Sequence, residues 1–186
     1  GRVKEVPQDE NTPYNPVSPY GVSKLASHEM VKVYRESYGI FACSGILFNH
    51  ESRLRGIEFV TKKITNGLSN WKRTGKPVIL GNLNAKRDWG HSADYVRAMV
   101  MMLSNTEPKD YVVATGHTYS IREFIIKCLK VLDIKYKNIN KGTVEEKFVD
   151  EYGNIIVECS KEYYRENEVD LLIGKANKIK KDLGWV

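Results

Sequence analysis

The sequence predicts an α/β fold with a parallel sheet, and three observations support this prediction. Segments with apolar residues at helical spacing alternate with short apolar runs that suit buried strands. The 186 residues are 41% hydrophobic and 28% charged, which is the composition of a globular protein. The first buried strand is expected only near residue 40, after a loop and a helix, so we interpret the chain as the later part of a larger protein.

The first helix is expected to begin at Ser18-Pro19 and to end at Gly39. Four prolines within the first 19 residues exclude a helix before that point. Ser18 suits the N-cap, Pro19 the first helical position and Gly39 the C-terminal end. The apolar residues expected to face a core are Val22, Leu25, Ala26, Met30, Val33 and Tyr34. The run 40–48 then predicts a strand buried on both faces.

The later elements are predicted in the same way. Residues 57–68 carry apolar side chains at helical spacing, and a short strand over 77–80 follows them. A third helix is expected to start at Ser92, and its inward-facing residues are expected to be Val96, Met99, Val100 and Leu103. A strand over 111–114 precedes a fourth helix, which opens with a capping box formed by Ser120 and Glu123. Strands over 135–139 and 155–159 and a helix near the C-terminus complete the prediction.

Charge and hydropathy exclude some classes of partner. A net charge of +6 is compatible with nucleic acid or with an anionic small molecule. The densest basic stretch, 175–181, has no interleaved aromatic residues, so no nucleic-acid partner is expected. Apolar stretches are far shorter than the ~20 residues of a membrane span, so no membrane partner is expected. No leader is recognisable, and Cys43, Cys128 and Cys159 lie far apart, so we expect a cytoplasmic protein without a metal site.

Tyr20 and Lys24 are the strongest candidates for catalysis. They are four residues apart, which places a phenol and an ammonium on one face at the start of the first helix. A free tyrosine has a pKa of about 10 and is a poor base at neutral pH, but a nearby lysine stabilises its phenolate. Such a pair accepts a proton from an alcohol. The spacing alone is common, and its position before a predicted buried strand is what favours catalysis.

A series of motifs in one order resembles a known family. Residues 18–24 (Ser-Pro-Tyr-Gly-Val-Ser-Lys) resemble the catalytic segment of the extended short-chain dehydrogenases/reductases. Residues 45–52 (Gly-Ile-Leu-Phe-Asn-His-Glu-Ser) and 87–91 (Arg-Asp-Trp-Gly-His) resemble more narrowly the GDP-mannose 4,6-dehydratases. This similarity runs nearly end to end. It implies an α/β fold that consists of the C-terminal part of a Rossmann-type parallel sheet plus a smaller α/β substrate-binding domain.

The resemblance also implies domain boundaries. Residues 1–50 are expected to form the later part of the Rossmann domain, with the catalytic helix and strand, and 51–84 a segment of the substrate domain. Residues 85–118 are expected to return to the Rossmann domain, and 119–186 to form mainly the substrate-binding domain.

The resemblance implies NADP as the cofactor, held by Tyr20, Lys24, His50 and Arg55. Tyr20 would take the proton of the sugar 4-hydroxyl as hydride leaves C4 for NADP. Water would then be lost across C5 and C6, and the hydride would return to C6. The implied product is GDP-4-keto-6-deoxymannose, made from GDP-mannose in the first step toward GDP-fucose and related deoxysugars.

The residues expected to contact GDP-mannose are Asn49, Lys63, Arg87, Arg165 and Glu168. A nucleotide diphosphate favours forked guanidinium and point ammonium cations, and an asparagine offers a hydroxyl or phosphate both donor and acceptor. Glu168 follows Arg165 by three residues and could accept from ribose hydroxyls. Each residue is alternatively a surface charge or part of an internal ion pair. Family members are usually dimers or tetramers, so a homo-oligomer is also implied.

The chain departs from the family pattern in two places. Arg53 and Leu54 stand where the family usually has proline and arginine. The family's glycine-rich nucleotide fingerprint, its catalytic Ser/Thr and its catalytic glutamate precede the first residue of this chain, so residues 1–186 alone are expected to be inactive. Two alternatives stay open at this point. One is another extended dehydrogenase/reductase acting on a nucleotide sugar, either an epimerase or a reductase, and the other is an inactive fragment that binds a nucleotide sugar.

Overall fold

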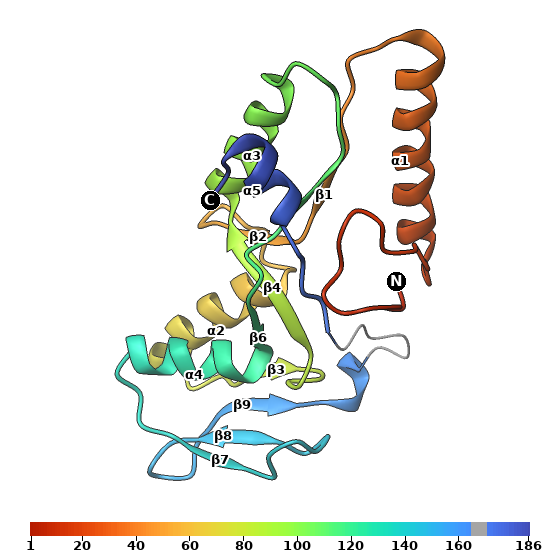
Figure 1. The fold of residues 1–186 in the computed structure, drawn as a ribbon. Coiled ribbons are helices and arrows are strands. Elements are labelled where there is room, and N and C mark those ends of the chain that lie inside the picture. Colours follow the sequence, from red (N-terminus) through yellow and green to blue (C-terminus); the bar gives the residue numbers. More distant parts are fainter. Residues whose placement is uncertain (165–170) are drawn as a thin grey trace. The chain divides into compact units, whose positions relative to one another are not determined.

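The chain folds into two compact units (Figure 1). The structure is a computed structural model, and it describes residues 1–164 and 171–186. The first unit consists of Gly1–Ser52, Arg87–Thr118 and Leu171–Val186, and the second consists of Arg53–Lys86 and Tyr119–Asp170.

Leu171–Val186 lies in the first unit, within the segment 119–186 that the sequence-based boundaries assign mainly to the substrate-binding domain. Ile179 and Trp185 are buried in one cluster with Tyr95, which belongs to the first unit. The burial of Ile179 and Trp185 could not be predicted from the lysine-rich segment 175–181, because a short helix with one buried apolar residue has little apolar periodicity.

Helix α1 (Pro19–Tyr38) has the bounds that the sequence predicts. The Ser18 hydroxyl accepts a hydrogen bond from the Gly21 amide at 3.1 Å. Gly39 ends the helix with a φ of 63°, a conformation that is strained for side chains other than glycine. Local capping chemistry therefore determines both ends of the helix that carries Tyr20 and Lys24.

Short parallel strands form the sheets of the first unit. Five strands lie wholly or partly in it: β1 (Gly45–Leu47), β2 (Asn49–Glu51), β4 (Lys86–His91), β5 (Tyr111–Val113) and β6 (Thr118–Ser120). β1 pairs with β5 so that Ile46 lies opposite Val112, and β2 pairs with β4 so that His50 lies opposite Gly90. β6 is the third strand of the β2-β4 sheet. Both of these pairings are parallel, which confirms the predicted type of sheet.

The prediction of a single strand over 40–48, buried on both faces, is wrong. The start of this segment is irregular and exposed, with Ile40 at 47% and Phe41 at 42% of full exposure. Gly45 is exposed and Ile46 is half-buried, although β5 beside them is fully buried. Among the described residues β1 pairs with one strand only, so a run that is apolar enough for the middle of a sheet lies at an edge.

The core of the first unit forms around β5. Helix α3 (Ser92–Leu103) and helix α5 (Asn177–Leu183) contribute to it, and the buried residues are Tyr95, Ala98, Met102, Tyr111, Val113, Ala176, Ile179 and Trp185. The expected inward face of α3 is wrong, because Val96, Val100 and Leu103 are 54%, 59% and 63% exposed. The stripe formed by Tyr95, Ala98 and Met102, which is also at helical spacing, packs inward instead.

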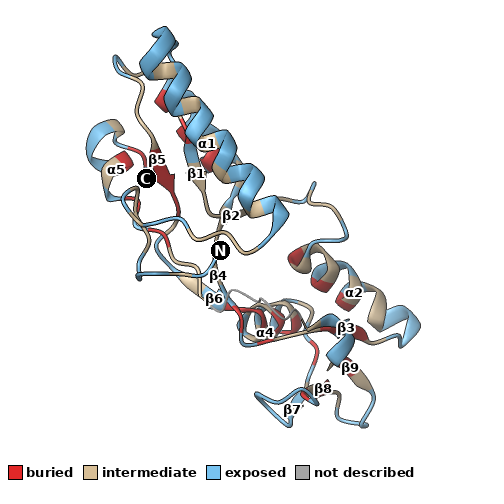
Figure 2. Cartoon of the chain, turned by 90° about the vertical axis from the view of Figure 1, so that its right-hand side faces the viewer, coloured by how far each residue is buried: buried red, intermediate tan, exposed pale blue. Residues whose placement is uncertain are grey.

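Helix α1 presents its apolar face to the surface. None of its residues is buried, and Val22, Met30 and Val33, which were expected to face a core, are each 54–55% exposed. Figure 2 shows α1 coloured mostly as exposed. An apolar stripe of this length is unusual on a protein surface and favours association with other apolar groups.

We expect residues 1–186 to self-associate when purified, and we expect the double variant Met30→Lys, Val33→Lys to reduce this association. Lysine keeps the helix propensity of α1 but removes apolar surface from its exposed face. Light scattering coupled to size-exclusion chromatography should show the variant shifted toward the monomer mass of 21.3 kDa.

The matched control is the double variant Leu54→Lys, Val131→Lys. Leu54 and Val131 are 87% and 85% exposed and lie outside α1. Their replacement by lysine adds the same charge as the α1 variant does. The control should leave the association unchanged. A wild-type chain that is monomeric at every concentration would contradict the prediction.

The second unit is a four-stranded sheet with two helices on one face (Figure 1). Its elements are α2 (Val60–Thr74), β3 (Val78–Leu80), α4 (Ile121–Val131), β7 (Lys137–Ile139), β8 (Lys147–Val149), β9 (Ile155–Cys159) and the short 3₁₀ helix η1 (Lys161–Tyr163). The strand order is β3-β9-β8-β7, with β3 parallel to β9 and the other pairs antiparallel. The helices, β3, β9 and part of β7 confirm the predicted elements, while β8 was not predicted.

The start of α4 is fixed by a capping box, as predicted. The Ser120 hydroxyl accepts from the Glu123 amide at 3.1 Å, and the Glu123 carboxylate accepts from the Ser120 amide at 2.7 Å. The Ser120 amide and the Ser120 hydroxyl, the latter at 2.8 Å, both donate to the Glu123 carboxylate and hold the pKa of Glu123 below its ordinary value. The helix buries Ile121, Ile125 and Leu129 toward the sheet.

A buried ion pair joins α4 to the β7–β8 hairpin. The Glu146 side chain is 1% exposed and the Arg122 side chain 11%. Arg122 donates to Glu146 through Nε at 2.6 Å and through a terminal nitrogen at 2.5 Å. Asn138 Nδ2 and the Gly142 amide each donate to the same carboxylate at 2.8 Å. Burial alone would raise the pKa of Glu146, but these hydrogen bonds outweigh it and the pKa lies below its ordinary value.

Candidate active site

Tyr20 and Lys24 lie together at the start of α1. The Lys24 ammonium is 5.5 Å from the centre of the Tyr20 ring, as expected for residues one turn apart. Tyr20 is 72% exposed. The phenol is therefore held near a cation at a capped helix end and is accessible to a ligand, an arrangement that suits proton exchange with an alcohol.

Asn49 and His50 are placed on β2 by the pairing with β4. Both are half-buried, and Asn49 lies opposite Trp89 in the register. His50 Nδ1 lies 2.9 Å from the Phe48 carbonyl oxygen, and its ring lies against the ring of Tyr95 with centroids 4.9 Å apart. The predicted cofactor residue is thus fixed on two sides within its own unit.

Arg87 lies on β4, half-buried, beside a carboxylate that sequence reasoning did not single out. Asp88 is fully buried and accepts hydrogen bonds from the Thr115 amide and hydroxyl at 2.9 and 2.6 Å. It also accepts from the Gly116 amide at 2.9 Å and the Gly174 amide at 3.2 Å. Asp88 thereby ties three distant segments together, which gives this residue of the 87–91 motif a structural role.

In the second unit, Arg55 and Lys63 each lie over an aromatic ring. The Arg55 guanidinium carbon is 3.4 Å from the centre of the Phe59 ring. Lys63 Nζ is 4.2 Å from the centre of the Tyr163 ring, and burial lowers the pKa of Lys63. Sequence reasoning missed Tyr163, since no local spacing links residue 63 to residue 163.

Lys63 faces a cavity of about 460 Å³ within the second unit. The polar side chains around it are those of Lys63, Asn66, Asn70, Thr74, Lys76 and Tyr163, and the apolar ones include Ile57 and Val78. The polar residues among these supply cations, amides and hydroxyls and no carboxylate, so the cavity suits an anionic, hydrogen-bonding ligand.

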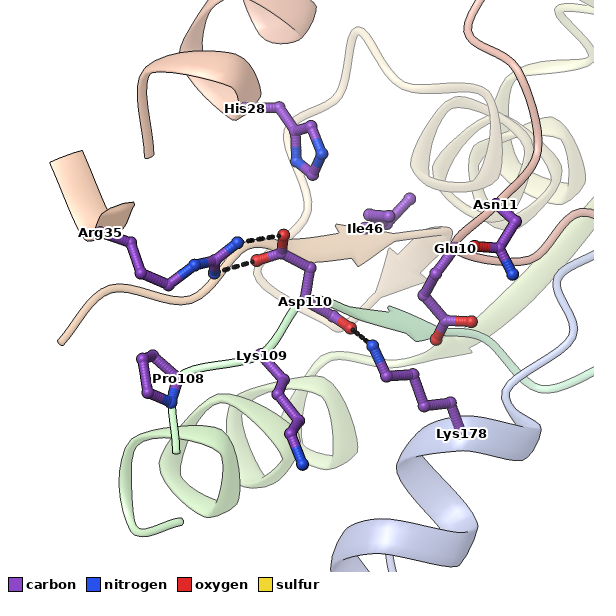
Figure 3. A pocket seen from close by; sticks show the side chains of 9 residues that line it. All are labelled: Glu10, Asn11, His28, Arg35, Ile46, Pro108, Lys109, Asp110 and Lys178. Atoms are coloured by element: carbon purple, nitrogen blue, oxygen red, sulfur yellow. Dashed lines mark hydrogen bonds and ion pairs between the residues drawn. The ribbon is translucent and has the colours of Figure 1, made fainter. Parts of the chain in front are cut away.

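A second cavity, of about 280 Å³, lies in the first unit (Figure 3). Arg35 donates twice to the Asp110 carboxylate at 2.8 Å, and Lys178 donates to the Asp110 backbone carbonyl at 2.8 Å. Glu10 accepts from the Val112 amide at 2.8 Å. This cavity contains none of the predicted site residues, and the hydrogen bonds of Arg35, Lys178 and Glu10 stabilise the fold. It is therefore not a candidate active site.

Three further results concern predicted substrate contacts, metal sites and membrane spans. Arg165 and Glu168, both predicted to contact substrate, lie outside the described residues. Within residues 1–164 and 171–186, no group of three or more His, Cys, Asp or Glu side chains could hold a metal ion. In the same part of the chain, no helix is both long enough and apolar enough to cross a bilayer.

Known sequences match this chain along its whole length. The family described as GDP-mannose 4,6 dehydratase matches residues 1–186. The chain is 48% identical to a GDP-mannose 4,6 dehydratase of Dictyostelium discoideum, covering 100% of this chain and 52% of that protein. It is 47% identical to one of Vibrio cholerae and 46% identical to one of Homo sapiens, covering 53% and 50% of them. The chain therefore spans about half the length of the curated relatives it matches.

Solved structures confirm the predicted fold class. A UDP-glucose 4-epimerase of Thermus thermophilus in complex with NAD matches with a TM-score of 0.78 at 21% identity, over 100% of this chain and 54% of that one. The protein RMD of Pseudomonas aeruginosa complexed with NADPH matches with a TM-score of 0.77 at 20% identity, over 97% and 54%. These likenesses show a Rossmann-type α/β fold. Together with the match over residues 1–186, they lead to one conclusion: the chain belongs to the GDP-mannose 4,6-dehydratase family.

Proposed function

We propose that this chain supplies the later half of an NADP-dependent GDP-mannose 4,6-dehydratase, which converts GDP-mannose to GDP-4-keto-6-deoxymannose and water. The observation that carries the proposal is the exposed Tyr20 phenol beside Lys24 at a capped helix start, in a chain of this family. The relatives' identities of 44–48% favour this substrate over those of other nucleotide-sugar enzymes, whose solved structures are about 20% identical.

In this proposal Tyr20 and Lys24 perform the proton chemistry. The Tyr20 phenolate accepts the proton of the sugar 4-hydroxyl, and the Lys24 ammonium stabilises the negative charge on the phenolate. NADP, if held by Tyr20, Lys24, His50 and Arg55, would supply a reversible acceptor for the hydride of the sugar. The loss of water across C5 and C6 needs a base that we assign to no residue of this chain.

The described residues fit a dinucleotide cofactor in their chemistry. Lys24 offers three donors for ribose hydroxyls, and Arg55 offers a planar cation. Among the described residues His50 Nε2 has no hydrogen-bond partner, so this half-buried nitrogen is available to a ligand. The four residues proposed to hold NADP are Tyr20, Lys24, His50 and Arg55.

GDP-mannose would be bound through charges and amides. Lys63 faces a cavity whose described lining residues carry no carboxylate, which supports a role in holding the anionic diphosphate or its base. Asn49 and Arg87, on neighbouring strands, are proposed to contact the same substrate, and so are Arg165 and Glu168. We further propose a homo-oligomer in the cytoplasm, for which the exposed apolar face of α1 offers a surface.

The test is a chimera in which residues 1–186 follow the first half of the Dictyostelium relative. Both halves come from one family, and the proposal places the cofactor fingerprint and the base for water loss in the half that the relative supplies. We expect it to convert GDP-mannose to the 4-keto-6-deoxy product, detected by mass spectrometry, and to leave UDP-glucose unchanged. A folded chimera that binds GDP-mannose without converting it would instead support an inactive binding protein.

Lys63→Met in this chimera is expected to raise the Kd for GDP-mannose by about ten- to a hundredfold. The loss of one charge-assisted contact costs about 1.5–3 kcal/mol, while methionine keeps most of the apolar stem over Tyr163. Calorimetric titration measures the change, and NADP affinity should stay the same.

Lys127→Met is the matched control. Lys127 Nζ lies 3.8 Å from the centre of the Tyr119 ring, so it forms the same kind of cation–π contact in the same unit but outside the cavity. Its replacement should leave the GDP-mannose Kd unchanged. Equal effects of the two substitutions would show that Lys63 acts through general surface charge.

A further inference from the structure

The contact of His50 with the backbone determines which of its nitrogens carries the proton. Nδ1 lies 2.9 Å from the Phe48 carbonyl oxygen. A carbonyl oxygen only accepts hydrogen bonds, so Nδ1 must be the donor. In the neutral imidazole the other nitrogen, Nε2, then has a free lone pair and is an acceptor.

The plane of the His50 ring is set by Tyr95. The two ring centroids are 4.9 Å apart with an interplanar angle of 31°, and Tyr95 is 1% exposed. Trp185 packs edge-on against Tyr95 at 6.2 Å and donates from Nε1 to the Asp94 carbonyl at 2.9 Å. The C-terminal tryptophan thus holds Tyr95, and Tyr95 holds the imidazole.

Gly90 makes this stacking possible. It lies opposite His50 in the β2–β4 register. A Cβ at this position would be 2.3 Å from Tyr95 Cε2, much closer than two carbon atoms can approach. Glycine at 90 therefore allows the Tyr95 ring to reach His50, which gives this residue of the 87–91 motif a specific role.

We propose that His50 accepts a hydrogen bond through Nε2 from a neutral donor of the cofactor, a ribose hydroxyl or the carboxamide NH₂, and that Tyr95 is the positioning residue for its ring. This inference rests on the proposed function, because cofactor binding is part of it. Phosphate oxygens are acceptors, and an unprotonated Nε2 facing them would make no hydrogen bond. The assignment therefore excludes a phosphate as the partner of His50.

The first test measures the tautomer in the 186-residue chain without cofactor. The imidazole carbon and nitrogen chemical shifts of labelled histidine, recorded above pH ~8 where a free imidazole is neutral, distinguish the two tautomers. His50→Asn assigns the signal among the four histidines. We expect the Nδ1–H form for His50, and an Nε2–H form would overturn the proposal.

The second test compares two substitutions in the chimera. Glutamine at 50 can offer an acceptor oxygen near the position of Nε2, whereas lysine offers donors only. We expect His50→Gln to keep the NADP affinity within a few-fold and His50→Lys to weaken it by about tenfold or more. If His50→Lys binds NADP as tightly as His50→Gln, or more tightly, the partner is a phosphate and the proposal is wrong.

A third comparison tests Tyr95. Tyr95→Phe keeps the stacked ring, so the His50 tautomer and the NADP affinity should be unchanged, while Gly90→Ala displaces the ring and should change both. Unchanged values in Gly90→Ala would overturn the positioning role. The failure of this inference can be distinguished from the failure of the proposed function. A chimera that binds no NADP contradicts the proposed function, whereas the His50 tautomer in the chain without cofactor tests only the present inference.

Discussion

Tyr20→Phe in the chimeric enzyme is expected to lower kcat for GDP-mannose by about 10²- to 10⁴-fold, the range contributed by general acid–base groups. The phenol oxygen is the atom that exchanges a proton with the substrate, and phenylalanine removes that atom while keeping the ring. Binding of GDP-mannose and NADP should change little, because the lost interaction belongs to the transition state. Steady-state kinetics and calorimetry on the same preparation separate the two effects.

The matched control is Tyr38→Phe at the other end of α1. Tyr38 is 71% exposed, almost the same as Tyr20 at 72%, but it lies about four helical turns beyond Lys24. Its kcat should equal that of the unsubstituted chimera. A Tyr20→Phe enzyme that keeps kcat within a few-fold would remove Tyr20 from the catalytic step.

Glu146→Leu is expected to lower the free energy of unfolding by about 3–5 kcal/mol, the cost of leaving a buried charge without its partner. Arg122 is 11% exposed in its side chain and would lose both of its bonds to the carboxylate. Asn138 and the Gly142 amide would lose their acceptor as well. Urea unfolding followed by circular dichroism measures the difference.

Two further variants test whether the lost stability comes from the buried Arg122–Glu146 ion pair. Glu145→Leu, next in sequence but exposed, should have little effect. Adding Arg122→Met to Glu146→Leu should recover much of the lost stability, since no charge is then buried alone. A double variant as unstable as the single one would show that the loss comes from packing.

The pH dependence of stability follows from the same carboxylate. The pKa of Glu146 in the folded chain lies below its ordinary value of 4.5. Its ionised form therefore stabilises the folded state above that value, and this contribution is lost as the pH falls through the folded pKa. The Glu146→Leu variant should show a shallower loss of stability below pH ~4.5 than the wild-type chain.

Local chemistry made several elements and part of the site predictable from the sequence. The cap at Ser18, Gly39 and the capping box at Ser120 and Glu123 depend on residues within a few positions of one another, and the structure has them as predicted. The same holds for Tyr20 and Lys24, which one helical turn brings together. Their assignment to catalysis stays a prediction.

Only the tertiary structure decided which apolar faces are covered and which distant residues meet. The faces of α1 and α3 that periodicity marks as inward are exposed, because burial depends on what packs against a helix and not on its own pattern. Strand β4 has little apolar alternation and exists through its pairing with β2. Tyr163 under Lys63 and Tyr95 beneath His50 are contacts that no spacing in the sequence could indicate, since chain packing alone brings them together.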